Sequence, residues 1–267
     1  MIYSSNMFKL TFNYHTHTKR CGHAVGEDEE YVLQAIKLGI KKLGFSDHVI
    51  LPKGFEQPGI RGSSTELEDY LNSVKYLKEK YKDQIEIFVG FEAEYFPQMM
   101  EYYKWLLENK VDYLIMGQHC YLKDNKFHWY FHKDSPIEDI KKYTDDVIAG
   151  LKTGLFKYLA HPDLFMHSQS SFNKEIEEQS HRILKTCEEL HIPVEINLCG
   201  GRRRDYDGLT YSYPNEKFFD LVKDYNLDVI IGMDVHDPNH FEQIAVDLGY
   251  EFAKRHSINP LEDFDIK

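Results

Sequence analysis

The chain of 267 residues has an ordinary globular composition, with 42% hydrophobic and 28% charged residues, which excludes a fibrous or disordered protein. Its net charge of −12 repels nucleic acid, so a phosphate site must be a local patch of arginines or metal ions. No apolar run approaches the roughly 20 residues of a membrane span, and the first residues do not resemble a secretory signal. The four cysteines include no C-x-x-C pair. We therefore expect a reduced, cytoplasmic protein with neither a membrane nor a nucleic-acid partner.

Short apolar segments alternate with helical patterns along the whole chain. Seven strands are predicted, at residues 10–15, 42–46, 85–90, 113–117, 158–160, 193–197 and 229–232. Helices are predicted at residues 28–38, 65–81, 99–107, 135–151, 174–190, 215–225 and 241–255. Residues 120–136 show no clear period and are predicted to form a loop.

Strands that alternate with helices predict an α/β fold with a parallel sheet. A closed barrel is favoured over two doubly wound halves, because the chain has no G-x-G-x-x-G turn. The prediction is a single TIM-like barrel domain over residues 1–267 with seven β/α units, one fewer than the usual eight.

Histidines and carboxylates follow the predicted strands one after another. They are His15 and His17, Asp47 and His48, Glu92 and Glu94, His119, His161 and Asp163, Glu195 and Asn197, and Asp234 and His236. A single histidine or aspartate after a strand is more often a cap or turn residue, but this pattern recurs at all seven strands. Because the carboxyl ends of barrel strands meet on one face, the pattern predicts a shared site there.

Nine residues are candidate metal ligands. They are His15, His17, His23, His48, Glu92, His119, His161, Asp234 and His236. Histidine and carboxylate together favour zinc, iron or manganese over calcium, and nine ligands suffice for two or three ions. Close metal pairs activate water and stabilise the attacking and leaving oxygens, so the set predicts a multi-metal hydrolase. A protease is less favoured, because no H-E-x-x-H motif occurs.

Several arginines are candidates for phosphate binding. Arg202, Arg203 and Arg204 follow the sixth strand and could bind phosphate through bidentate hydrogen bonds, or form a solvated basic turn. Arg20 and Arg61, in the loops after the first two strands, are further candidates.

Three carboxylates beside the candidate ligands have two interpretations. Glu94, Glu195 and Asp163 could bind a cationic group of a substrate. They could equally hold the ligand histidines in place through hydrogen bonds.

The ordered motifs carry a family resemblance. The matching segments are Tyr14-His-Thr-His-Thr18, Cys21-Gly-His-Ala24, Glu30-Tyr-Val32, Gly44-Phe-Ser-Asp-His48, Gly90-Phe-Glu92, His161-Pro-Asp-Leu164, Glu195-Ile-Asn197, Tyr213-Pro214 and Gly232-Met-Asp-Val-His236. The chain resembles the PHP (polymerase and histidinol phosphatase) family, and within it the histidinol-phosphate phosphatases. It departs at Gly117-Gln-His119, where many relatives carry Gly-Ser-x-His, and at Met233 and Val235, where Ser and Ala are commoner. The candidate ligands are kept in both motifs.

The resemblance implies a distorted seven-stranded barrel with three divalent transition-metal ions at the carboxyl ends of the strands. In that family pattern His15, His17, Glu92 and Asp234 would hold one ion, Glu92, His119 and His161 the second, and His23, His48 and His236 the third. The implied reaction is hydrolysis of L-histidinol phosphate to L-histidinol and phosphate, in histidine biosynthesis. A hydroxide bridging two metals would attack phosphorus, and Asp234 or His236 would protonate the leaving alkoxide.

Alternative functions differ in substrate or chemistry. The chain could be a phosphoesterase of the same family that acts on another small phosphate ester or a nucleotide. A non-catalytic metal-binding protein is disfavoured because the ligand set is complete. An amidohydrolase is disfavoured because no lysine is placed to bridge metals after the fourth strand. The sequence fixes neither the metal nor the oligomeric state.

Overall fold

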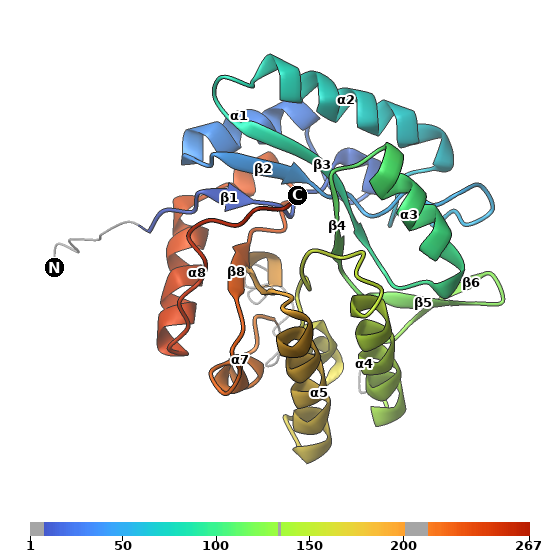
Figure 1. Cartoon of the computed structure of the whole chain (residues 1–267), viewed down its shortest axis with the longest axis vertical. Helices are drawn as coiled ribbons and strands as arrows, with labels where there is room; N and C mark the ends of the chain where they lie inside the picture. The colour runs from blue at the N-terminus through green and yellow to red at the C-terminus, as the bar shows by residue number, and fades with distance from the viewer. Residues whose placement is uncertain (1–7, 133–134, 201–212) are drawn as a thin grey trace, which may run out of the picture.

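The computed structural model describes residues 8–132, 135–200 and 213–267, and its centre is a curled parallel sheet (Figure 1). Four parallel strands lie in the order β1 (Phe12–Asn13), β2 (Lys42–Phe45), β3 (Glu86–Ala93) and β4 (Tyr113–Met116). Two further strands, β7 (Val194–Asn197) and β8 (Val229–Gly232), pair with each other in parallel. Single bridges of Leu159 to Met116 and to Val194 connect the two parts, and Thr16 bridges to Val235 just after β8. The fold is therefore mixed α/β, as predicted.

Helices surround the curled sheet (Figure 1). They are α1 (Asp28–Leu38), α2 (Leu67–Lys80), α3 (Met100–Asn109), α4 (Ile137–Leu151), α5 (Lys174–Leu190), α7 (Glu216–Val222) and α8 (Gln243–Arg255). Short 3-10 turns lie at Lys19–Cys21, Ser64–Glu66, Pro97–Met99, Leu164–Ser168 and Pro238–His240. None of the described helices is long and apolar enough to cross a membrane.

Local capping explains why the helix bounds were predictable. The Asn173 side chain accepts hydrogen bonds from the amides of Glu175 and Ile176, which satisfies two donors at the start of α5. Helix α1 ends at Gly39, whose φ of 95° is readily adopted only by glycine. Both helices have the predicted bounds.

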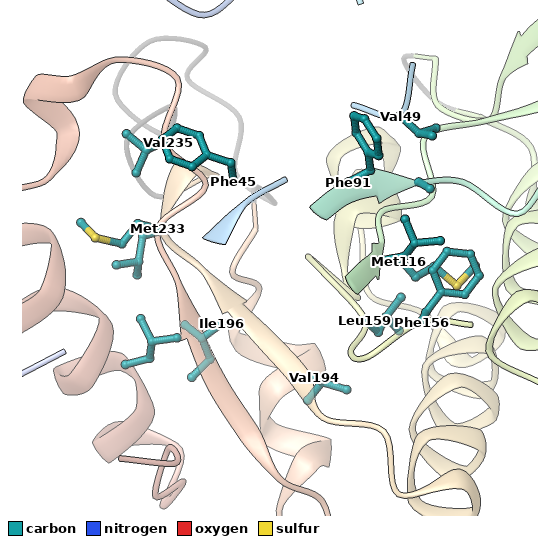
Figure 2. Close-up of a cluster of buried hydrophobic side chains, with 14 of the residues drawn as sticks. Phe45, Val49, Phe91, Met116, Phe156, Leu159, Val194, Ile196, Met233 and Val235 are labelled. Carbon is teal, nitrogen blue, oxygen red and sulfur yellow. The ribbon is translucent and has the colours of Figure 1, made fainter. Parts of the chain in front are cut away.

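The main apolar core lies between the sheet and the helices (Figure 2). Phe45, Phe91, Met116 and Ile196, which lie on β2, β3, β4 and β7, belong to this core and are fully buried. Apolar burial is the dominant stabilising contribution in a fold of this kind. This layer fixes the strands, and the strands in turn fix where their carboxyl ends meet.

A second core cluster is aromatic and includes the C-terminal segment. It contains Phe12, Tyr14, Phe88, Tyr113 and Tyr158, together with Ile266. The Tyr14 hydroxyl donates to the Phe264 carbonyl at 2.7 Å. The last residues of the chain thus pack against the inner side chains of β1 and β3.

Two predicted elements differ in kind in the structure, and the strand predicted at residues 10–15 is shortened to β1, Phe12–Asn13. Residues 120–136 contain a hairpin of β5 (Cys120–Lys123) and β6 (Lys126–Trp129) in place of an irregular loop. Asp124 and Asn125 both have positive φ, the geometry of a tight two-residue hairpin turn. The predicted strand at 158–160 is reduced to the single bridging residue Leu159.

Candidate metal centre

The Glu92 carboxylate on β3 is the meeting point of the predicted ligands. It is 1% exposed and faces histidines that follow β1, β2 and β4 and the Leu159 bridge. Oε1 lies 3.6 Å from His15 Nε2, 3.5 Å from His119 Nε2 and 2.7 Å from His161 Nε2. Oε2 lies 3.4 Å from His17 Nε2 and 3.1 Å from His48 Nδ1. The two carboxylate oxygens therefore face different sets of histidines.

Asp234, two residues after β8, forms the opposite side of the cluster. Its Oδ1 lies 3.6 Å from His15 Nε2, 3.3 Å from His17 Nε2 and 3.3 Å from His236 Nδ1. The Asn197 amide donates to Asp234 Oδ2 at 3.1 Å. This bond orients the carboxylate toward the histidines.

Three histidine rings form the outer part of the cluster. The centroid of the His23 ring lies 4.9 Å from that of His236 and 5.3 Å from that of His48. His23 Nδ1 lies 3.1 Å from the Gly59 carbonyl, which can only accept a hydrogen bond. Nδ1 must therefore carry the proton, and Nε2 keeps the lone pair that a metal requires.

The geometry of the inner ligands fits a divalent cation. Around a tetrahedral ion with bonds of 2.0–2.1 Å, neighbouring donor atoms lie about 3.3 Å apart. The donor atoms of His15 and His17 lie 3.3–3.6 Å from the nearest oxygens of Glu92 and Asp234. His15 Nε2 is buried and makes no hydrogen bond with any described residue. These clusters of histidine and carboxylate are suited to bind divalent metal.

The carboxylates behind the ligands hold the histidine rings. Glu195 Oε1 lies 2.9 Å from His15 Nδ1, and Glu94 Oε1 lies 3.2 Å from His119 Nδ1. Each contact fixes the proton on Nδ1 and directs Nε2 toward Glu92. Both carboxylates are fully buried and neither lines the cavity. Of the two interpretations of Glu94 and Glu195, the structure therefore favours support of the ligands over binding of a substrate cation.

Charge compensation keeps the central carboxylates ionised. Burial alone would raise the pKa of Glu92, but the neighbouring His119 and His15 hold it well below its ordinary value. The pKa of Asp234 is likewise held well below its ordinary range by His15 and His17, against the effect of burial. Burial lowers the pKa of His48 well below its ordinary value, so this ring is neutral, the state that binds metal.

The predicted phosphate-binding arginines Arg20 and Arg61 bind carboxylates of the protein itself. Arg20 donates to Asp28 at 2.9 Å and to Asp69 at 2.8–2.9 Å. Arg61 is fully buried and binds the two oxygens of Glu94 at 3.0 and 3.3 Å. Neither arginine lines the cavity, so both are better explained as structural. Arg202, Arg203 and Arg204 lie outside the described residues.

A cavity of about 440 Å³ opens above the ligands, which is a size suited to a small molecule. Eight of the nine predicted ligands line it, and the ninth, His15, lies beneath them, 0% exposed. Trp129 and Phe131 also line it, although nothing in the sequence singled them out. Their place follows from the hairpin, whose Asp124-Asn125 turn is the signal that could have revealed it.

Cys21 also lies close to the proposed ligands. Its Sγ is within 4.8 Å of ligand nitrogens on His23 and His236. Burial raises the pKa of this thiol to about 12, so it stays protonated near neutral pH.

Two glycines make room for the central carboxylates. A Cβ at Gly117 would lie 1.8 Å from Glu92 Oε1, and a Cβ at Gly232 would lie 1.7 Å from Glu195 Oε1. No side chain fits at either position unless the carboxylate moves. The two glycines are thus part of the site, although they offer no ligand.

The candidate ligands His161 and Asp234 have strained backbones. Their φ values are 29° and 49°, which residues other than glycine rarely adopt. Such strain costs roughly 1–3 kcal/mol per residue and concentrates at functional sites, where the surrounding structure enforces it.

We predict that Gly117→Ala weakens metal binding. The new methyl group displaces the Glu92 carboxylate, and disturbed ligand orientation typically costs roughly 10–100-fold in metal affinity. Metal titration of the chelator-treated protein measures the effect. Gly249→Ala on α8 is the control, because its Cβ comes too close only to the movable end of Leu198 and otherwise makes ordinary contact with Ile231. Equal affinities in wild type and Gly117→Ala would contradict the prediction.

We further predict that Arg61→Met destabilises the fold by about 3–5 kcal/mol near neutral pH, because it leaves Glu94 charged and buried without its partner. Arg61 and His119 now hold the pKa of Glu94 below its ordinary value, against burial. Without Arg61, burial raises that pKa, and protonated Glu94 needs no cation. The destabilisation should therefore shrink as the pH falls toward 4.5.

Urea unfolding at several pH values measures this loss. Arg182→Met is the control, because Arg182 and its partner Asp145 are exposed, and such pairs contribute about 0–1 kcal/mol. If Arg61 instead binds the phosphate group of the substrate, Arg61→Met would raise KM and leave the free energy of unfolding unchanged.

Comparison with known proteins supports the interpretation of the histidine and carboxylate cluster as a metal centre. The family model of the PHP domain matches residues 13–198. A probable histidinol-phosphatase of Deinococcus radiodurans is 24% identical over 90% of this chain and 88% of its own length. The histidinol-phosphatase of Bacillus subtilis is 21% identical over 89% of this chain and 95% of its own.

Among solved structures, the histidinol phosphate phosphatase of Lactococcus lactis, in complex with zinc, L-histidinol and phosphate, has a similar fold. It aligns with a TM-score of 0.72 and 18% identity over 95% of this chain and 96% of its own. Because the family model covers more than half of the chain, the chain belongs to the PHP domain family.

Proposed function

We propose that this protein is a metal-dependent phosphatase that hydrolyses L-histidinol phosphate to L-histidinol and phosphate. The observation that carries the proposal is the convergence of histidines on the buried Glu92 carboxylate, beneath a cavity of small-molecule size. The names of the relatives from Deinococcus radiodurans and Bacillus subtilis support the choice of substrate. The same two names support a role in histidine biosynthesis.

We assign three divalent ions to the centre. The first is assigned to His15, His17, Glu92 and Asp234, the second to Glu92, His119 and His161, and the third to His23, His48 and His236. Glu92 can serve both the first and the second ion, because its Oε1 faces His119 and His161 and its Oε2 faces His17. Zinc is favoured by the donor set, and iron and manganese suit the same ligands. Bound ions of this kind polarise phosphoryl oxygens and lower the pKa of water.

The residues around the ions have distinct tasks in the proposed reaction. Glu94 and Glu195 hold ligand rings, and the buried walls keep bulk water from the carboxylates. Asp234 and His236 line the cavity, and either could take up a proton from the attacking water and pass it to the leaving alkoxide. Arg202, Arg203 and Arg204 remain candidates for phosphate oxygens on the basis of charge and sequence position.

We also propose that the whole chain forms one closed, distorted barrel with the metal centre at the carboxyl ends of its strands. The bridges at Leu159 and between Thr16 and Val235 support closure, because they connect the two parallel groups of strands. The position of Glu92, His119 and Asp234 near the ends of β3, β4 and β8 supports the placement of the centre.

The test is phosphate release from L-histidinol phosphate beside a generic aryl phosphate, with the metal content measured in the same sample. We expect a kcat/KM of about 10⁴ M⁻¹s⁻¹ or above for L-histidinol phosphate, far above that for the aryl ester. Equal, feeble rates on both esters from a metal-loaded protein would contradict the proposed substrate. Nucleotides and other small phosphates would then be assayed next.

A further inference from the structure

The β5–β6 hairpin presents one of its faces to the interior of the protein. Residues directly opposite in an antiparallel pair share a face, and Cys120 pairs with Trp129 while Leu122 pairs with Phe127. Cys120 and Leu122 are buried, and the Phe127 ring packs 5.8 Å from that of Phe96. Trp129 therefore lies on the inward face, opposite the residue that directly follows the ligand His119.

Contacts on the other face fix the hairpin to α4. The Tyr121 and His128 rings stack with centroids 5.1 Å apart, and Lys142 Nζ on α4 lies 4.4 Å from the centre of the Tyr121 ring. Just after the hairpin, the Tyr130 hydroxyl donates to Asp146 on α4 at 2.5 Å. The hairpin, seen beside β4 and α4 in Figure 1, is thus held in place from outside the cavity.

The cavity has two chemically different parts. Its floor consists of the candidate metal ligands, and its apolar wall includes Trp129, Phe131, Ile60 and Leu164. Phe131 is fixed by packing against Tyr143 at 5.2 Å between ring centroids, whereas Trp129 keeps 40% of its surface exposed. A large aromatic side chain that is exposed beside a polar site is suited to stack on a ligand.

We propose that Trp129 is a specificity residue that stacks on a flat, unsaturated ring in the alcohol part of the substrate. The inference rests on the proposed function, since a phosphate group held at the floor leaves the alcohol part to face the wall. Imidazole suits this wall in both protonation states. The neutral ring stacks on indole, and the protonated ring adds a cation–π attraction.

The chain offers a matched control for this residue. Its two tryptophans, Trp129 and Trp105, are both 40% exposed. Trp105 lies on α3, stacks on Tyr102 at 5.7 Å between ring centroids, and does not line the cavity. Substitution of either residue removes a similarly exposed indole, but only Trp129 can contact a ligand above the metal centre.

The kinetic test compares two phosphate esters, one with a ring and one without. We expect Trp129→Ala to raise KM for L-histidinol phosphate about 3- to 10-fold, the effect of losing one aromatic contact, with kcat nearly unchanged. Trp129→Phe should restore most of the loss, and Trp105→Ala should cause none. KM for O-phosphoethanolamine, which lacks a ring, should be unaffected by all three substitutions.

The equilibrium test uses fluorescence and does not require hydrolysis. Trp105→Phe leaves Trp129 as the single tryptophan, and we expect L-histidinol to change its emission saturably in the metal-loaded protein. The ring-free 2-aminopropan-1-ol should not change it. Trp129→Phe, in which only Trp105 reports, should show no saturable change with either alcohol.

Together, the kinetic test and the fluorescence test distinguish failure of this inference from failure of the proposed function. Hydrolysis of L-histidinol phosphate with the same KM in Trp129→Ala, or equal KM losses on both esters, would overturn the stacking role and keep the phosphatase. A saturable, ring-selective change at Trp129 without hydrolysis of L-histidinol phosphate would keep the stacking role and overturn the proposed substrate.

Discussion

The buried carboxylate of Glu92 is the constraint on which the rest of the site depends. Removing an ionised carboxylate from water is costly unless it is paired, and here five histidines face its two oxygens. Those histidines come from four separate segments of the chain, each following a parallel strand or the bridging residue Leu159. The carboxylate therefore brings together the strand ends that the apolar core has positioned.

The structure around this centre is arranged in layers. Gly117 and Gly232 leave space for carboxylates where any side chain would collide. Glu94 and Glu195 orient histidine rings from behind, and Arg61 neutralises Glu94 in the protein interior. Each layer thus supplies the space, the orientation or the opposite charge that the layer inside it requires. A positive φ at His161 and Asp234 fits this view, because the packing holds two ligands in conformations that an isolated chain would avoid.

Much of this arrangement could be predicted because it depends on local signals. The alternation of side chains along an extended segment predicted that His15 and His17 share a face, and they flank the bridging residue Thr16. It does not account for Asp234-x-His236, because Asp234 has a positive φ. The bounds of α1 and α5 follow from their capping residues. The family resemblance supplied the grouping of ligands, and the cluster around Glu92 agrees with the convergence that it implied.

The features that the sequence did not reveal depend on contacts between distant segments. Arg61 was expected to bind phosphate, but its partner Glu94 lies 33 residues along the chain and no local pattern connects them. Leu159 makes only single bridges to its neighbours, so the strand predicted from the three apolar residues 158–160 is longer than the pairing that forms. Trp129 enters the cavity through hairpin pairing, which its own residue type does not indicate.

The most direct test of the account is the metal content and phosphate release of Glu92→Gln beside wild type, prepared under identical conditions. Glutamine keeps the size of the side chain but removes the charge that the histidines surround. The account predicts a folded variant that has lost metal and turnover of L-histidinol phosphate together. A Glu92→Gln protein that keeps the full metal content and near-normal turnover would contradict the central role of this carboxylate.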